Sequence, residues 1–440
     1  MPRRPPLPPG PYLVVGLGRA GFAAAKALAA SAGPAAVRAW DSAADTVHLE
    51  RAAELRGAGV EVRLGGDGLD ALGDARTLVK SPGVPPEIPV VVEALRRGVE
   101  MVDEFEIGWY LVPAPIVGVT GTNGKSTTSN LCVEVLRAHG LEPVLAGNTD
   151  FGPPLSELAV AEPPASVVAE VSSYQTEFAR ELAVDAAIFT NLTPDHLNRH
   201  EDMEAYGAAK RKLFVRGDWC VPLALLNSDD ELGTRLAREV QERGGTAFTY
   251  GFEAGADYRI ADAAWELRSA EVTVEAPDGP VCIETRLPGF HNAANVTAVL
   301  ALGDALGLPR SVTLQALAIA DPVPGRFEPV DVDRPFDVVV DYAHSTDSIE
   351  KVLRTGRETA AARGGRLLTV LSLMGRIAPL IGPEVGVIAR ELSDHLVICG
   401  ASLRGEPRIV AMAALLAGAR TVEGGRLEVV IDRREGIACG

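Results

Sequence analysis

The residues from Thr120 to Thr127 read T-G-T-N-G-K-S-T and combine residue types that bind phosphate groups. They follow an apolar stretch, 115–119, which predicts a buried strand, and they precede a predicted helix over 126–139. Glycines let backbone N–H groups approach phosphate oxygens, and the start of a helix favours an anion. The alternative is a glycine turn with a structural role only. We predict an ATP-binding loop made of Gly121, Thr122, Asn123, Gly124, Lys125, Ser126 and Thr127.

Three later residues could complete a magnesium site beside this loop. Glu170 lies at the end of an apolar stretch over 167–171, and His196 follows the predicted strand Ala186–Phe189. A carboxylate can bind Mg²⁺, and an imidazole can bind or orient a metal ligand. Taken singly, these two residues would more often be a solvated strand end and a surface histidine. We predict that the residues holding the metal are Ser126, Glu170, His196 and Lys210.

Lys210 has a separate chemical possibility. Only six of the 42 basic residues are lysines, so a lysine in this chain indicates a site that needs a compact or deprotonatable amine. A neutral, buried amine can add CO₂ and become an anion that bridges two Mg²⁺ ions. The ordinary alternative is a surface lysine whose stem covers apolar atoms. We expect Lys125, Lys210 and His196 to take part in catalysis.

The elements that position these residues form an α/β pattern of three domains. Tyr12–Val15 predicts a strand, a glycine turn and an alanine-rich helix follow, and a second strand over 37–40 ends at Asp41. This is a Rossmann-like opening, which alone would suggest NAD, and Asp41 could equally cap a helix. We predict a disordered proline-rich tail over residues 1–10, followed by a first domain over 11–112.

The rest of the chain predicts two further α/β domains. The second, over 113–320, should hold the phosphate loop on a parallel sheet, with a small antiparallel insert over 257–286. The third, over 321–440, should be Rossmann-like, with strands at Val338–Val340, 367–371 and 395–398.

Composition narrows the class of protein. The chain has 440 residues, of which 47% are hydrophobic and 23% charged, as in a globular enzyme and unlike a disordered chain. A net charge of −17 argues against nucleic acid as a partner, and no stretch is long and apolar enough to span a membrane. Five scattered cysteines predict neither disulfides nor a zinc site, and no secretion signal is apparent. We expect a monomeric cytoplasmic enzyme.

The order and spacing of the motifs closely resemble the central domain of the Mur ligases, which build the peptide stem of peptidoglycan. The resemblance rests on G-T-N-G-K-S-T, E-V-S-S, N-L-T-P-D-H-L-N-R-H and A-Y-G-A-A-K. It implies ATP and two Mg²⁺ ions, one of them bridged by carbamylated Lys210. It also implies a UDP-MurNAc-linked substrate and an amino acid. A folylpolyglutamate synthetase would share this core but should lack the first domain.

The same resemblance assigns residues outside the phosphate loop. It places Asn292 and Asn295 at the adenine, Arg326 at the nucleotide and Asp341 at the ribose, and His344 would help to deprotonate the incoming amine. The residues that it assigns to the UDP-linked substrate are Gly16, Leu17, Gly18, Arg19, Asp41, Ser81, Gly83, Asn148 and Ser173.

The two ends of the chain resemble different branches of this family. Residues 14–21, 81–86 and 103–109 are similar to the D-glutamate-adding ligases, whereas residues 341–348 and 432–435 are closer to the ligases that add the third residue. Arg404 stands where the latter carry an amino-acid-binding arginine, but the motif around it differs, and the resemblance leaves open that the third domain is incomplete. We expect D-glutamate addition to UDP-MurNAc-L-Ala. The alternatives are a third-residue ligase, an L-glutamate-adding variant and a non-catalytic binding paralogue.

Overall fold

The computed structural model describes residues 4–197, 199–374, 377–400 and 408–440, and the chain forms two compact units. The first unit contains Met1–Leu192, His196–Arg259 and Thr297–Ala316. The second contains Thr193–Asp195, Ile260–Val296 and Leu317–Gly440. In the described part of the chain, no helix combines the length and apolar character that a membrane crossing needs.

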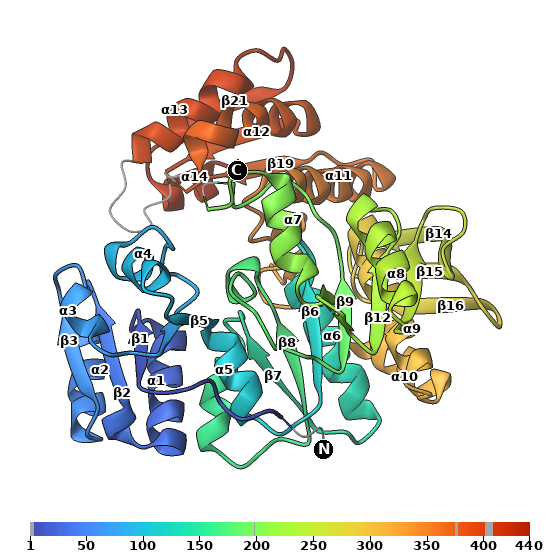
Figure 1. Ribbon diagram of the computed structural model, residues 1–440. Helices are drawn as coiled ribbons and strands as arrows, with labels where there is room; N and C mark the ends of the chain where they lie inside the picture. The colour runs from blue at the N-terminus through green and yellow to red at the C-terminus, as the bar shows by residue number, and fades with distance from the viewer. Residues whose placement is uncertain (1–3, 198, 375–376, 401–407) are drawn as a thin grey trace. The chain divides into compact units, whose positions relative to one another are not determined.

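The first five strands make a parallel sheet in the order β3-β2-β1-β4-β5 (Figure 1). Alternate residues of β1 pack into two separate cores, Tyr12 and Val14 with α1 and α2, and Leu13 and Val15 with α3 and α4. Both faces are therefore covered, which explains why all four residues of β1 are apolar. The elements are β1 (Tyr12–Val15), α1 (Arg19–Ala32), η1 (Pro34–Ala36), β2 (Val37–Asp41), α2 (Thr46–Gly57), β3 (Glu61–Leu64), α3 (Leu69–Leu72), β4 (Thr77–Lys80), α4 (Pro89–Arg96), β5 (Glu100–Asp103) and α5 (Glu104–Leu111).

Residues 4–10 make contacts within the first unit instead of forming the disordered tail that their proline content predicts. The Arg4 guanidinium donates to the carbonyls of Ala114, at 2.8 Å, and Ala183, at 3.1 Å. Nearer the sheet, the Tyr12 hydroxyl donates to the Pro8 carbonyl at 2.6 Å. Prolines restrict the unfolded chain, so a proline-rich segment loses less entropy when such contacts order it.

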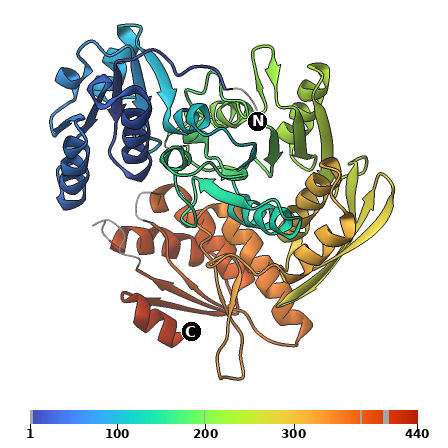
Figure 2. The same ribbon diagram turned by 90° about the horizontal axis from the view of Figure 1, so that it is seen from below.

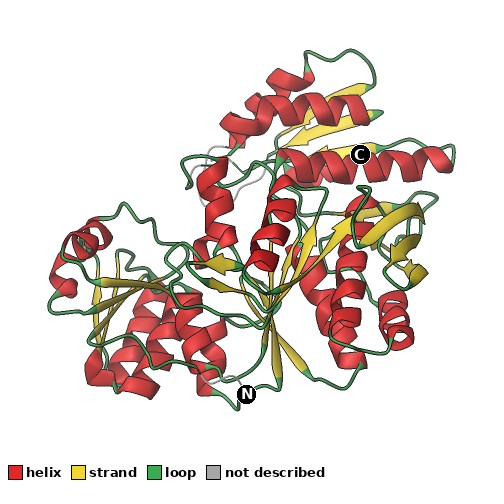
Figure 3. Cartoon of the chain, turned by 45° about the vertical axis from the view of Figure 1, so that its right-hand side comes forward, coloured by secondary structure: helices red, strands yellow, loops and turns green. Residues whose placement is uncertain are grey.

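A nine-stranded sheet carries the phosphate loop, in the order β16-β15-β14-β13-β12-β9-β6-β8-β7 (Figure 3). Strands β6, β7, β8, β9, β12 and β13 are parallel, and β14 continues them through a parallel pairing of Tyr258 with Tyr250. At the other end of the sheet, β15 pairs antiparallel with β16. The predicted parallel sheet and antiparallel insert are thus parts of one mixed sheet. Its strands are β6 (Ile116–Thr120), β7 (Pro143–Gly147), β8 (Ser166–Glu170), β9 (Ala186–Phe189), β12 (Leu223–Asn227), β13 (Thr246–Gly251), β14 (Tyr258–Glu266), β15 (Ser269–Ala276) and β16 (Gly279–Thr285).

Helices packed on this sheet have clear apolar faces. Leu232, Leu236 and Val240 of α8 recur at four-residue spacing and are all buried. Phe189 and Phe214 meet edge to face in the same core, with ring centroids 6.2 Å apart. The remaining elements here are α6 (Lys125–Ala138), η2 (Leu155–Val160), η3 (Ser173–Gln175), α7 (Met203–Arg211), β10 (Val215–Arg216), β11 (Trp219–Cys220), α8 (Glu231–Glu242), α9 (Phe290–Ala305) and α10 (Arg310–Ile319).

The C-terminal part contains a parallel sheet in the order β19-β20-β21 and a separate hairpin, β17–β18 (Figure 2). Val338–Val340, expected as a strand of the Rossmann-like sheet, pairs antiparallel with β17 instead. Helices α12 and α13 pack closely because Gly418 has no side chain: a Cβ there would lie 1.7 Å from the Pro383 carbonyl. The elements are β17 (Glu328–Val330), β18 (Val338–Val340), α11 (Thr346–Ala362), β19 (Leu368–Leu371), α12 (Ala378–Leu392), β20 (His395–Cys399), α13 (Arg408–Ala419), β21 (Arg426–Val430) and α14 (Arg433–Cys439).

Candidate functional site

The predicted phosphate loop lies between β6 and α6 and depends on its two glycines. Gly121 and Gly124 have φ angles of +151° and +86°, which side chains rarely tolerate. A Cβ on Gly121 would also lie 1.9 Å from the Thr190 hydroxyl. That hydroxyl donates to the Asn123 carbonyl at 2.6 Å, and the Asn191 side chain accepts the Asn123 N–H at 2.9 Å. The segment after β9 therefore holds the loop in place.

Two lysines converge on one carbonyl of this loop. Lys125 donates to the Gly121 carbonyl at 3.1 Å and to the Thr122 carbonyl at 2.7 Å. Lys210, which is 1% exposed, donates to the same Gly121 carbonyl at 2.7 Å, and its amine lies 4.4 Å from the centre of the Tyr206 ring. The two amines therefore lie within two hydrogen-bond lengths of each other at this loop.

A hydroxyl and a carboxylate meet at the start of α6. Ser126 donates to Glu170 at 2.9 Å, and Glu170 is buried at the end of β8. These oxygen donors fit Mg²⁺, which usually takes one or two protein ligands and completes its shell with phosphate oxygens and water. Within the described residues, no group of three or more histidine, cysteine or acidic side chains could hold a metal alone. Phosphate oxygens of a nucleotide and water molecules would complete the shell of a magnesium ion bound here.

His196 lies in a turn with strained backbone geometry. Its φ angle is +56°, although it is not a glycine, and its Nδ1 is 3.0 Å from the Tyr174 hydroxyl. His200 lies 2.9 Å from the Ser173 hydroxyl through Nε2, and burial lowers the pKa of His200. The Tyr206 ring centre is 6.0 Å from that of His196 and 5.1 Å from that of His200.

Sequence reasoning assigned no role to Tyr174, His200 or Tyr206. Spacing offered a signal for two of them, because Tyr206 precedes Lys210 by one helical turn on α7 and His200 follows His196 by four residues. Tyr206 also lies 3.2 Å from the Thr122 hydroxyl, so it contacts the phosphate loop directly.

The predicted substrate residues of the first sheet meet at the carboxyl ends of β1, β2 and β4. The Leu17 N–H donates to the Asp41 carboxylate at 2.6 Å, and the Ser81 N–H donates to the Val15 carbonyl at 3.0 Å. Asp45, not Asp41, caps α2 by accepting the His48 N–H at 3.1 Å. The helix-cap alternative for Asp41 is therefore wrong. Such an edge of an open parallel sheet is where α/β proteins bind nucleotides.

The turn after β7 contacts both Arg19, at the edge of the first sheet, and Glu170, at the end of β8. Arg19 donates to the Thr149 carbonyl at 3.3 Å and to the Gly152 carbonyl. The Asn148 N–H donates to the Glu170 carbonyl at 2.7 Å. Gly83 is exposed, and a Cβ there would have no atom within 4 Å.

The predicted adenine and ribose residues belong to the second unit. Asn292 and Asn295 are buried on α9 and hydrogen-bonded to each other at 3.1 Å. Asp341 accepts two backbone N–H groups at 2.6 Å, although burial raises the pKa of Asp341 overall. Arg326 lies over the Tyr342 ring at 5.4 Å, and His344 Nδ1 is 2.9 Å from the Tyr342 carbonyl. Arg404 lies outside the described residues.

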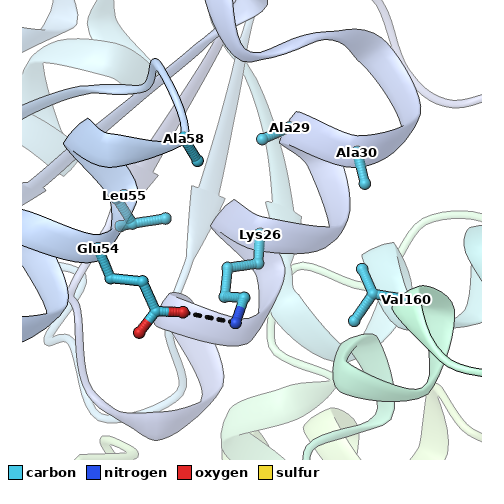
Figure 4. Close-up of a pocket in the computed structure, with 7 residues that line it drawn as sticks. All are labelled: Lys26, Ala29, Ala30, Glu54, Leu55, Ala58 and Val160. Atoms are coloured by element: carbon cyan, nitrogen blue, oxygen red, sulfur yellow. Dashed lines mark hydrogen bonds and ion pairs between the residues drawn. The ribbon is translucent and has the colours of Figure 1, made fainter.

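One cavity of about 300 Å³ lies away from these residues (Figure 4). An ion pair of 2.6 Å between Lys26 and Glu54 crosses it. None of the predicted site residues is among its lining residues, which are Lys26, Ala29, Ala30, Glu54, Leu55, Ala58 and Val160.

Family models match three consecutive parts of the chain. Residues 11–103 match the Mur ligase MurD-like N-terminal domain, and residues 119–303 match the Mur ligase middle domain. Residues 325–439 match the Mur ligase glutamate ligase domain.

Curated relatives named for two different steps are about equally similar. The UDP-N-acetylmuramoyl-L-alanyl-D-glutamate–2,6-diaminopimelate ligase of Thermosynechococcus vestitus is 36% identical over 344 residues, covering 72% of this chain and 68% of the relative. The UDP-N-acetylmuramoylalanine–D-glutamate ligase of Nitrosococcus oceani is 35% identical over 320 residues, covering 72% and 67%.

Solved structures share the fold. The UDP-N-acetylmuramate-alanine ligase of Thermotoga maritima superimposes with a TM-score of 0.61 at 23% identity, covering 96% of this chain and 90% of that one. MurF from Acinetobacter baumannii gives 0.62 at 16% identity, covering 92% and 83%. With three Mur ligase models matched in order and two relatives above 30% identity, this chain belongs to the Mur ligase family and is an ATP-dependent ligase.

Proposed function

We propose that this Mur ligase adds D-glutamate to UDP-N-acetylmuramoyl-L-alanine. As a Mur ligase it joins an amino acid to a UDP-MurNAc-linked acceptor, and the choice of amino acid is what the proposal adds. The observation that carries the proposal is the MurD-like model matched over residues 11–103, the part that would bind the UDP end and set the acceptor's length. We further propose that the enzyme acts in the cytoplasm as a monomer, with domain boundaries near residues 112 and 320.

The geometry of the first sheet supports the acceptor site. Asp41 fixes the Leu17 N–H, and Ser81 is fixed on Val15, so the glycine turn, an acidic side chain and a hydroxyl are held at one sheet edge. Backbone N–H groups at such a turn suit a pyrophosphate, and a carboxylate suits the hydroxyls or N–H groups of a nucleoside.

The phosphate loop would orient ATP for attack by the acceptor's terminal carboxylate. A carboxylate oxygen forms a bond to the γ-phosphorus, the bond to the β-γ bridging oxygen breaks, and ADP leaves. Lys125 would neutralise charge on the transferring phosphoryl group, and Ser126 and Glu170 would hold Mg²⁺, which supplies further charge neutralisation. The Lys125 amine now donates to the Gly121 and Thr122 carbonyls. A short movement would let it donate to phosphate oxygens instead.

The second half of the reaction consumes the acyl phosphate. The amine of the amino acid attacks the acyl carbon, a tetrahedral intermediate forms, and inorganic phosphate leaves as the amide bond is completed. A proton must leave the amine, and we propose His344 as the group that helps to accept it. We propose Arg404 as a partner for the amino acid's carboxylate, since a guanidinium matches that geometry.

We also propose that Lys210 is carbamylated in the active enzyme. Burial at 1% exposure disfavours the charged amine, and a neutral amine is the form that adds CO₂. The carbamate would be an anionic ligand in a place where an ammonium would repel the metal. Glu170 contributes a carboxylate to the same loop through Ser126.

Phosphate release with purified components tests the substrate. The acceptor UDP-MurNAc-L-Ala is combined with ATP and D-glutamate or L-glutamate. In parallel, UDP-MurNAc-L-Ala-D-Glu is combined with diaminopimelate or L-lysine. Lys125→Ala serves as the inactive control. Release that depends on D-glutamate supports the proposal, and the product should gain the mass of one glutamate residue.

Other outcomes of this assay would favour one of the alternative functions. Release only with L-glutamate, or only with the longer acceptor, would replace the proposed step by another Mur step. No release with any pair, from a protein that binds UDP, would favour the non-catalytic paralogue.

A further inference from the structure

A buried arginine connects two ligand-binding segments of the first unit. Arg199 follows the strained His196 by three residues, and its side chain is 9% exposed. Its Nη2 donates to the Val84 carbonyl at 2.7 Å, in the turn 81–84 that begins with Ser81. The same nitrogen donates to the Glu177 carboxylate at 2.7 Å.

Glu177 extends this connection to the end of β4. One of its carboxylate oxygens, Oε2, accepts from Arg199 and lies 3.2 Å from the amine of Lys80. Lys80 is completely buried and also lies 3.2 Å from Asp103, which accepts the Phe178 N–H at 2.5 Å. Arg199, Glu177, Lys80 and Asp103 are thus connected in one largely buried network.

Three members of the network, Lys80, Glu177 and Arg199, lie within four residues of a predicted site residue. Lys80 directly precedes Ser81, and Glu177 follows the short helix that contains Ser173. The Arg199 N–H donates to the His196 carbonyl at 2.9 Å, which holds the turn in which His196 has its positive φ angle. A displacement of turn 81–84 would therefore change the position of Arg199 and, through it, of His196.

Opposite charges hold Arg199, Glu177 and Lys80 together in this network. Burial by itself would raise the pKa of Glu177, but hydrogen bonds and positive charge from Arg199 and Lys80 outweigh it, and the pKa is lowered. Glu177 is accordingly held as an anion between the two cations. Removing one member of a buried ion network leaves a charge uncompensated, so the members should move together.

We propose that Arg199 is a positioning residue that couples the UDP-binding turn 81–84 to the turn carrying His196, so that UDP and magnesium–nucleotide bind cooperatively. This inference rests on the proposed function, because it takes turn 81–84 as part of the UDP site. Arg199 acts through Val84 and His196 and needs no contact with either ligand. The coupling is reciprocal: each ligand raises the affinity for the other by the same factor.

Calorimetric titration of the full chain measures this factor. UDP is titrated with and without saturating Mg²⁺–adenylyl imidodiphosphate, for the native protein, Arg199→Gln and Arg199→Lys. Arg310→Gln is the matched control, because Arg310 forms a comparable arginine–carboxylate pair with Asp304 between α9 and α10. We expect the analogue to raise UDP affinity at least about fivefold in the native protein and in the control.

In Arg199→Gln the factor should fall to near one, while the affinity for UDP alone stays within about threefold. If circular dichroism shows that Arg199→Gln does not fold, the coupling factor of Arg199→Lys is the deciding measurement. This variant keeps the charge but not the guanidinium, and it should give an intermediate factor. A full factor in the folded Arg199 variants, or independent binding in the native protein, would overturn the coupling and leave the ligase assignment intact. Failure of the native protein to bind UDP at all would overturn the proposed acceptor site as well.

Discussion

Glu104, the first residue of α5, should make the stability of the protein depend on pH. The side chain is completely buried, and one oxygen accepts the Ser156 hydroxyl at 2.5 Å. The other oxygen, Oε2, has no hydrogen-bond partner among the described residues. Burial raises the pKa of Glu104 from 4.5 to about 7, so the folded protein resists ionisation of this group. The perturbation that tests this is Glu104→Gln, which removes ionisation and nearly preserves the shape.

The size of the effect follows from the raised pKa. A change from 4.5 to about 7 corresponds to roughly 3 kcal/mol between the two protonation states. Because the folded pKa is the higher one, the contribution of neutral Glu104 is fully present below pH 4.5. It is lost as the pH rises through about 7. Glu104→Gln should therefore leave the free energy of unfolding nearly unchanged at pH 4.5 and raise it by up to roughly 3 kcal/mol at pH 8.5, less any cost of burying the amide.

Differential scanning calorimetry at the two pH values provides the assay. A gain of this size should raise the melting temperature by roughly 5 °C at pH 8.5. Glu157→Gln is the matched control, because Glu157 lies next to Ser156 on η2 but is exposed, and its melting temperature should hardly change at either pH. An equal shift for Glu104→Gln at both pH values would refute the reasoning, since it would show that the charge of Glu104 has no part in the effect.

The remaining predictions concern catalysis. Lys125→Ala should lower phosphate release by on the order of 10²-fold or more without unfolding the protein, because the glycines set the loop's shape; substantial activity would remove Lys125 from the ATP site. Gly121→Ala should weaken binding of Mg²⁺–ATP at least about tenfold by calorimetry, because its Cβ would meet the Thr190 hydroxyl at 1.9 Å; unchanged affinity would contradict this account of the loop. Lys210→Ala should be nearly inactive and partly restored by bicarbonate or a short carboxylate in the phosphate assay. Lys210→Arg should stay inactive, and an active arginine variant would show that positive charge alone suffices.

Local patterns were enough to predict the strand–loop–helix geometry around residues 120–127. The loop 120–127 combined a strand, glycines, a lysine and a helix start within a few residues, and the structure places them as the pattern indicates. Lys210 was predicted to join Lys125 from 85 positions further along the chain, and the two do meet on the Gly121 carbonyl. That prediction depended on the family resemblance, because no periodicity in the sequence links the two lysines.

Non-local packing could not be predicted from the sequence. Nothing near Lys80 indicates that its amine faces Glu177, almost a hundred residues later, or that Arg199 completes the network. The order of residues 4–10 could not be predicted for a related reason. Proline content describes the free chain, whereas these residues are held by contacts such as those of Arg4 with two distant carbonyls. The continuity of β14 with β13 also depends on strand pairing, which alternation of residues within a strand does not determine.

The scarcity of lysine has a practical consequence for labelling. Of the six lysine side chains, Lys80 and Lys210 are buried and Lys125 and Lys212 are partly buried. Lys26 and Lys351 are the more accessible, at 42% and 38% exposure. Amine-reactive dyes and surface-coupling reagents should therefore attach mainly at Lys26 and Lys351, leaving the amines of the phosphate loop unmodified. A peptide map of an acylated sample would then report on the loop, because any rise in labelling at position 125 or 210 would mean that the loop had opened.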